Sequence, residues 1–129
     1  MKITFLQLKN AQPALTKLLN TDLDVRVSLT LRRVVKAVNA ELEHFDAERM
    51  RLLEKFAQKD EAGKIVTKDD QAVFGDEGVF VQFRTEFEKL AGVEIEMDVK
   101  PIDLSKIEGV KMSPVELDTI DPFLVADEQ

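Results

Sequence analysis

One apolar ladder in the middle of the chain limits the folds that this sequence can adopt. Its members step by four and three residues, and Arg49 is the one position that interrupts the pattern: Leu31, Val35, Val38, Leu42, Phe45, Leu52 and Phe56. Such alternation predicts a single long amphipathic helix with a seam like that of a coiled coil. We expect this helix to run from about Val25 to Lys59.

The length of this predicted helix bears on function. At 1.5 Å per residue it spans roughly 50 Å, whereas a compact globule of 129 residues has a diameter of only about 35 to 40 Å. Part of the seam must therefore be covered by another element of the chain or by another chain. The seven ladder residues form the candidate interaction seam, and the pattern favours a binding or assembly protein.

Size and composition are those of one ordinary domain. A chain of 129 residues with 44% hydrophobic content can bury a core without disulfides, and it contains no Cys. No run of 18 apolar residues is present, and the start lacks the features of a secretory signal. We expect a soluble, cytoplasmic, single domain over 1–129: a helical hairpin (1–60), a β-hairpin, helix and strand (61–100), and a packed C-terminal segment (101–129).

Charge is distributed unevenly along the sequence. Residues 1–36 carry seven Lys and Arg against two Asp, whereas residues 94–129 carry ten Asp and Glu against three Lys. This polarity can steer the two ends of one fold, or two copies of it, towards each other. The net charge of −7 argues against nonspecific binding to nucleic acid, because the acidic excess repels phosphate outside one small patch.

The first segment allows two interpretations. Its apolar residues suit either a short strand or a first helical turn, and Pro13 marks either a kink or the start of a helix. We favour a short helix that ends near Asn20. Residues 20–24 then turn the chain, and Asp24 is a suitable N-cap for the long helix.

The middle of the chain predicts a small β-hairpin, a second helix and a strand. Residues 65–67 and 72–74 are apolar and flank a polar turn. Asp76 can cap the second helix and Gly92 can end it, and the strict alternation over 93–99 predicts a strand with one buried face. The apolar face of the second helix consists of Phe80, Phe83, Phe87 and Leu90, and we assign its phenylalanine stripe to the core.

The C-terminal segment carries its own helix signal. Ser113, Pro114 and Glu116 match a capping box with proline at the first helical position, and we expect residues 126–129 to fray. Six large apolar side chains of this segment are expected to pack: Ile102, Leu104, Ile107, Leu117, Ile120 and Phe123. The predicted fold is therefore α+β and mostly α: a long helix packed on a second amphipathic helix, with a small β-hairpin and a short C-terminal strand and helix.

His44, the only histidine, is the one residue that suggests a metal site. Glu41 and Glu48 lie three and four residues away, so all three share a face of the long helix. Glu-x-x-His, used twice with two further Glu, binds two metal ions in some four-helix bundles. One chain supplies a single copy, and these positions flank the seam. We favour a solvated charged face and no metal, and leave metal binding by a dimer open.

The densest basic cluster lies at the start of the long helix and forms a candidate basic patch: Arg26, Arg32, Arg33 and Lys36. No aromatic residue is interleaved for base stacking, and no zinc finger or helix-turn-helix pattern accompanies it. The simplest interpretation is pairing with the acidic C-terminal part. The sequence also lacks a calcium loop, a phosphate-binding Gly-rich loop and a nucleophile elbow.

Several segments are familiar when taken together. They are residues 14–20, 51–56 leading into 59–64, 87–90, 93–96, 102–105, 112–117 and 121–124. This layout resembles a group of small proteins of unknown function that are encoded by tailed phages and prophages. The resemblance covers nearly the whole chain but carries structural motifs rather than functional residues. It implies a phage gene product in a bacterial cytoplasm that serves as an accessory or assembly protein.

We therefore expect a non-enzymatic interaction or assembly protein that uses no cofactor. Its partner would be a protein, either a second copy or another phage or host protein, and not a membrane. The alternative is a small nucleic-acid-binding regulator that uses the basic patch.

Overall fold

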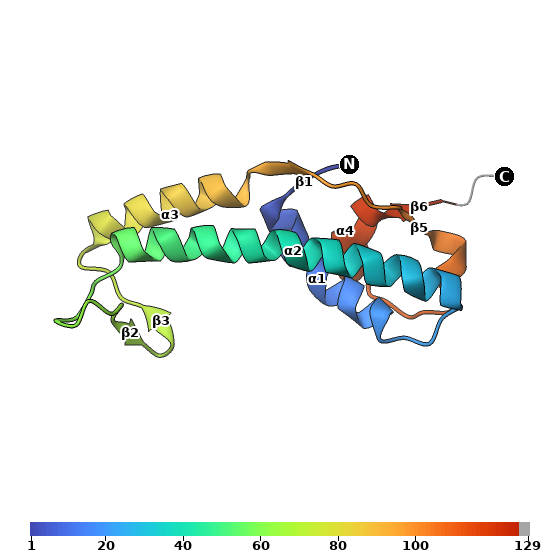
Figure 1. The fold of residues 1–129 in the computed structure, drawn as a ribbon, viewed down its shortest axis with the longest axis horizontal. Coiled ribbons are helices and arrows are strands. Elements are labelled where there is room, and N and C mark those ends of the chain that lie inside the picture. The colour runs from blue at the N-terminus through green and yellow to red at the C-terminus, as the bar shows by residue number, and fades with distance from the viewer. Residues whose placement is uncertain (127–129) are drawn as a thin grey trace. The chain divides into compact units, whose positions relative to one another are not determined.

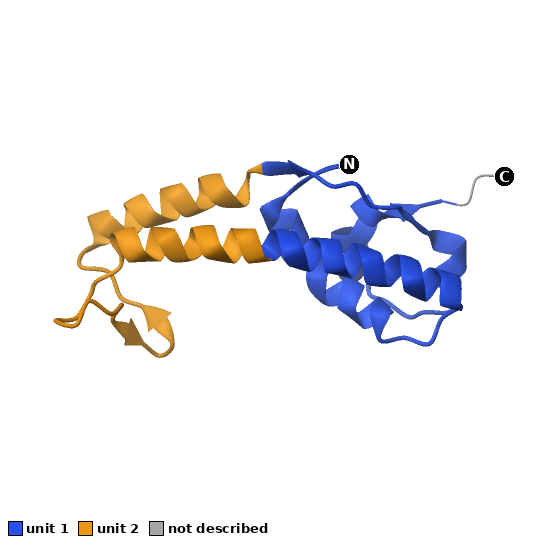
Figure 2. Cartoon of the chain, viewed as in Figure 1, with its two compact units in different colours: residues 1–42, 94–129 blue, residues 43–93 orange. Residues whose placement is uncertain are grey.

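The computed structural model describes residues 1–126, which form four α-helices joined by short strand pairs and 3-10 turns (Figure 1). Two compact units are present: unit 1 consists of residues 1–42 and 94–129, and unit 2 of residues 43–93 (Figure 2). Helix α2 (Val25–Phe56) contributes to both. Whether the chain behaves as a single domain stays a prediction. Of the residues expected to fray, 127–129 lie outside the described part.

Unit 1 begins with both elements that the sequence allowed. Strand β1 (Lys2–Thr4) leads directly into helix α1 (Phe5–Leu19). The junction is a capping box: the Gln7 N–H donates to Thr4 Oγ1 at 3.1 Å, and the Thr4 N–H donates to Gln7 Oε1 at 2.9 Å. The Thr-x-x-Gln spacing is visible in the sequence and marks this boundary. Pro13 lies inside α1 on its exposed side, where water can solvate the carbonyl that proline leaves without a donor.

The core of unit 1 is formed by β1, α1, the first part of α2 and the C-terminal segment. The amide of Gln12 donates to the Asn39 Oδ1 at 2.7 Å and joins the two helices at the rim. Asp24 caps α2 as predicted, because its Oδ1 accepts the Arg26 N–H at 2.9 Å. The largest side chains with less than 2% exposure, all in unit 1, are Ile3, Leu8, Leu15, Leu18, Leu31, Val34, Val38, Ile102, Ile120 and Phe123.

The C-terminal segment returns to this core through two strand pairs. Strand β4 (Glu94–Glu96) pairs antiparallel with β1, with Ile95 opposite Ile3, and β5 (Ile102–Asp103) pairs in parallel with β6 (Leu124–Val125). Between β5 and β6 lie a 3-10 turn, η1 (Leu104–Ile107), helix α4 (Pro114–Ile120) and a second 3-10 turn, η2 (Asp121–Phe123). Helix α4 packs against α1.

Burial of this segment is largely as predicted, with two corrections. Ile107 is buried with the other inward residues, but Leu104 and Leu117 are exposed. Helix α4 has seven residues, and its inward side is set by Ile120 and the half-buried Glu116, four residues apart. Leu117 lies about 100° around the helix from Glu116 and therefore points to solvent.

Unit 2 consists of the end of α2, helix α3 (Glu77–Ala91) and a β-hairpin. Asp76 caps α3 as predicted, since its Oδ1 accepts the Val79 N–H at 2.9 Å. Gly92 ends the helix as predicted, with φ −88°. The rings of Phe45 on α2 and Phe87 on α3 are in edge contact at 5.8 Å, so the long helix packs on the second amphipathic helix.

The predicted hairpin is present but short. Strands β2 (Thr67–Lys68) and β3 (Gln71–Ala72) are joined by Asp69 and Asp70, both with positive φ (53° and 63°), which is the conformation of a two-residue type I′ turn. Helix α2 ends at Phe56, three residues before the predicted end. The fold as a whole is α+β and mostly α, as the sequence predicted.

Candidate functional site

The structure divides the candidate interaction seam. Leu31, Val35, Val38, Leu42 and Phe45 are buried within the chain, whereas Leu52 and Phe56 are only partly covered. The buried part of the seam therefore serves the core. The part that remains accessible for a partner lies at the C-terminal end of α2, in unit 2.

Six phenylalanine rings of unit 2 form a continuous cluster, which we call the phenylalanine cluster: Phe45, Phe56, Phe74, Phe80, Phe83 and Phe87. Phe83 is its centre. Its ring lies 5.9 Å from Phe87, 6.5 Å from Phe56 and 4.9 Å from Phe74. Phe74 in turn contacts Phe80 at 5.3 Å. Such distances lie in the range of favourable aromatic pairs, so the cluster ties α2, α3 and the segment after the β-hairpin together.

The phenylalanine cluster is incompletely covered. Phe45 is 3% exposed, but Phe56, Phe74, Phe83 and Phe87 are half-buried and Phe80 is 41% exposed. In unit 2 the only buried residues are Phe45, Ala57 and Ala91. The assignment of the Phe80, Phe83 and Phe87 stripe to the core is therefore wrong for Phe80, while Phe83 and Phe87 are half-buried. Two helices and a hairpin cannot enclose rings of this size, because a small unit has too little interior.

A shallow groove of about 390 Å³ runs along one side of the two helices of unit 2, beside the cluster. It is lined by Lys55 and Phe56 from α2 and by Val81, Gln82, Thr85 and Glu86 from α3. Val81 is itself 41% exposed, and Met50 of α2 is exposed as well. The accessible apolar surface of unit 2 thus combines this groove with the open part of the phenylalanine cluster.

Exposed ion pairs also lie on α2 and α3 of unit 2, and Glu86 of one pair lines the groove. Arg51 pairs with Glu48 at 3.0 Å, and Lys89 with Glu86 at 3.2 Å. These pairs are exposed and add little to the free energy of unfolding. An apolar centre with a charged, solvated edge is the usual composition of a protein interface.

The candidate basic patch is exposed along the start of α2. Arg26, Arg32, Arg33 and Lys36 are all solvent-exposed, and none forms an ion pair with a carboxylate within residues 1–126. The expected pairing of this patch with the acidic C-terminal part is not seen in that range. Lys17 makes such a pair instead, with Glu116.

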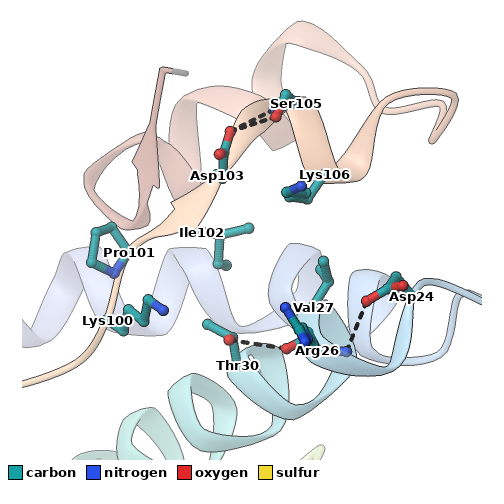
Figure 3. Close-up of a pocket in the computed structure, with 10 residues that line it drawn as sticks. All are labelled: Asp24, Arg26, Val27, Thr30, Lys100, Pro101, Ile102, Asp103, Ser105 and Lys106. Atoms are coloured by element: carbon teal, nitrogen blue, oxygen red, sulfur yellow. Dashed lines mark hydrogen bonds between the residues drawn. The ribbon is translucent and has the colours of Figure 1, made fainter. Parts of the chain in front are cut away.

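Tertiary structure adds two lysines that sequence analysis missed. Lys100 and Lys106 line a groove together with Arg26, at the start of α2 and along β5 and η1 (Figure 3). They lie more than seventy residues from Arg26 in the sequence, so only the return of the C-terminal segment brings them close. No local motif marks them.

The Glu41, His44 and Glu48 set does not form a metal centre in the described chain. His44 and Glu48 are exposed, and Glu48 pairs with Arg51. Within residues 1–126 no three His, Cys, Asp or Glu side chains are placed to hold a metal ion. Metal binding by a dimer stays an open hypothesis.

Asp103 and Glu116 are two of the three carboxylates of unit 1 with a lowered pKa, and Glu96 is the third. The Ser105 hydroxyl and its backbone N–H donate to Asp103 Oδ1 at 2.8 and 2.9 Å and lower the pKa of Asp103. The backbone N–H of Ser113 and then Lys17 Nζ lower the pKa of Glu116. Both carboxylates have local structural roles, because Asp103 caps η1 and Glu116 completes the capping box of α4.

Comparisons with protein-family models, with curated proteins and with solved structures found no match to this chain. The functional interpretation therefore depends on the surfaces described above. Within residues 1–126, none of the helices combines the length and the apolar character that crossing a membrane requires.

Proposed function

We propose that this chain is a non-enzymatic interaction or assembly protein that pairs with a second copy of itself through unit 2. The observation that supports this most is the open phenylalanine cluster, in which five of six rings are partly exposed. Contiguous apolar surface of this kind on a soluble protein marks an interaction site. A bacterial cytoplasm and a phage or prophage gene are proposed from the sequence resemblance alone.

A second copy is the partner that the local architecture favours. The end of α2 and helix α3 form a two-helix hairpin in which the partly covered phenylalanine cluster is the open face. Two such hairpins related by a twofold axis would bury both faces at once and make a four-helix arrangement, because a twofold interface uses the same surface on each copy. Leu52 and Phe56, the accessible part of the candidate interaction seam, would then lie in this interface.

Chemical cross-linking tests which surface of the chain contacts the second copy. The chain contains no Cys, so Val81→Cys places a single thiol in the groove of unit 2, and a short bismaleimide can link two copies. Val115→Cys is the matched control, because Val115 is 72% exposed in unit 1. We expect the Val81→Cys variant to give covalent dimers and the control to give few. Equal linking, or more linking through position 115, would contradict a pairing surface on unit 2.

A second candidate function is binding of nucleic acid through the candidate basic patch. The supporting observation is that its four cations are exposed and make no ion pair within residues 1–126. Phosphate contacts must give a steep loss of affinity with salt. Titration of duplex and single-stranded DNA across a salt series tests this. The Arg32→Gln/Lys36→Gln variant should lower the slope of log affinity against log salt concentration by about two. Absence of binding at low salt would exclude this function.

A further inference from the structure

A groove of about 660 Å³ opens in unit 1 at the start of α2, apart from the surface proposed for pairing. The residues that line it come from the first turns of α2 and from the segment that contains β5 and η1. Its volume is within the range of small-molecule sites. Figure 3 shows Arg26 on α2 and Lys106 on η1 facing each other across the groove.

Three cationic side chains of the described residues line this groove without a direct ion pair. Arg26, Lys100 and Lys106 form no ion pair with any carboxylate of residues 1–126. Cations that converge in one concave site raise the local positive potential and attract an anion. Arginine adds a planar fork of donors that suits phosphate oxygens.

The two carboxylates in the groove wall are already engaged elsewhere. Asp24 Oδ1 accepts the Arg26 backbone N–H at 2.9 Å, and Asp103 Oδ1 accepts from the N–H and the hydroxyl of Ser105. Figure 3 shows the Asp103 carboxylate directed at Ser105. These acids reduce the positive charge of the groove but do not neutralise the three cations by direct contact.

The floor of the groove is apolar. Val27 and Ile102 are buried beneath the cations, and Pro101 lines the wall. No aromatic side chain lines the groove, so a nucleobase would find no ring to stack on. The site therefore suits a ligand that has one strongly charged anionic group and a non-aromatic carbon body.

We propose that this groove binds a small organic phosphate, with Arg26, Lys100 and Lys106 on the phosphate and Val27, Pro101 and Ile102 on the carbon body. A phosphate monoester carries about −1.5 to −2 charges at neutral pH and three acceptor oxygens. Its charge and its three oxygens suit a groove that is lined by three cations, whereas a carboxylate carries one charge and two oxygens. The phosphate could belong to a free metabolite or to a lipid headgroup.

Isothermal titration of the full chain with butyl phosphate tests the site. Inorganic phosphate and pentanoate are the comparison ligands, because each lacks one of the two recognised parts. We expect butyl phosphate to bind at least about tenfold more tightly than either, since losing the apolar contact or one charged contact costs about that factor. Equal affinity for the three probes, or no saturable binding, would overturn the proposal.

Variants locate the binding. Arg26→Gln and Lys106→Gln should each weaken butyl phosphate about tenfold or more. Arg32→Gln on the same helix and Lys111→Gln are matched controls, because both remove an exposed charge outside the groove. An equal loss in the controls would overturn the site in favour of nonspecific charge. All four residues are exposed, so a thermal melt of each variant should match the parent.

Two further arms identify the source of the phosphate. Binding of the chain to vesicles of phosphatidic acid in phosphatidylcholine would indicate a lipid headgroup. Binding of butyl phosphate without binding to the vesicles would indicate a soluble metabolite. Either result supports the phosphate site provided that Lys106→Gln weakens the observed binding about tenfold or more. The contrary outcome is that a DNA duplex binds more tightly than butyl phosphate and loses this binding in the Arg26→Gln and Lys106→Gln variants. That result would overturn the small-ligand assignment and support nucleic acid as the ligand.

Discussion

Lys17 on α1 and Glu116 on α4 are joined by an ion pair across ninety-nine positions of sequence, with Lys17 Nζ at 3.2 Å from both carboxylate oxygens. The same carboxylate accepts the Ser113 N–H at 3.0 Å and completes the capping box of α4. One side chain thus both starts α4 and holds it against α1. The C-terminal segment is part of the fold of unit 1.

Stability should depend on pH through Glu116. Its pKa is lowered below the ordinary 4.5 in the folded chain, so its contribution is fully present above about pH 4.5 and is lost as the pH falls through the folded value. Glu116→Gln keeps a side-chain acceptor for the cap and removes the charge. We expect urea unfolding to show this variant less stable than the parent at pH 7, with the difference shrinking at pH 3.

Lys17→Met provides the cross-check for that result. In the variant that carries both changes, the effect of Glu116→Gln at pH 7 should be smaller than it is alone, because the Lys17 contact is already absent. A Glu116→Gln effect that is the same at both pH values would show that the charge of Glu116 does not stabilise the fold.

Removing the N-cap of α4 should destabilise the chain measurably. The Ser113 Oγ accepts the Glu116 N–H at 3.1 Å, and loss of such a cap costs about 1 kcal/mol. For a chain of this size, Ser113→Ala should lower the melting temperature by roughly 3 to 6 °C. Ser28→Ala, inside α2, is the control and should change it little. Equal melting temperatures for Ser113→Ala and the parent would mean that α4 does not contribute to cooperative unfolding.

Deleting residues 101–129 should unfold the chain. The deletion removes four buried side chains, Ile102, Ile107, Ile120 and Phe123. At about 1.5 to 3 kcal/mol each, their burial rivals the stability of about 5 to 15 kcal/mol that is typical of a domain. Circular dichroism on heating should show no cooperative transition. A truncated chain that melts within a few degrees of the parent would mean that the segment is a separate arm.

A charge placed on the open face of unit 2 should weaken self-association without unfolding the chain. Val81→Glu introduces a good helix former at an exposed position of α3. If two copies pair there, the variant would bury a carboxylate. We expect the dimer dissociation constant to rise by about tenfold or more. Val115→Glu, at an exposed position in unit 1, should leave it unchanged. Identical effects of the two variants on the dimer dissociation constant would contradict an interface on unit 2.

Local signals explain the parts of the fold that the sequence predicted well. The seam spacing predicted α2, and the residue types at Asp24, Asp76 and Ser113 predicted three helix starts that the structure confirms. These features depend on neighbours within four residues, so they can be read without knowing the tertiary structure. The class, α+β and mostly α, follows from them.

Long-range contacts explain what the sequence could not predict. Helix α2 ends early because the Gln58 N–H donates to the Val73 carbonyl and the Gln58 carbonyl accepts the Val66 N–H, which draws residues 57–59 into the hairpin. The phenylalanine stripe has the same spacing whether its rings are covered or open, so only the packing shows that Phe80 is exposed. Likewise, Lys100 joins Arg26 only because β5 returns to the start of α2.

Sedimentation velocity on the full chain, from about 1 µM to several hundred µM, tests the central claim most directly because it spans the affinities of weak and moderate dimers. We predict that the weight-average sedimentation coefficient rises with concentration to that of a dimer, and that Val81→Glu shifts this rise to higher concentration. A chain that stays a monomer over the whole range would contradict self-association through unit 2.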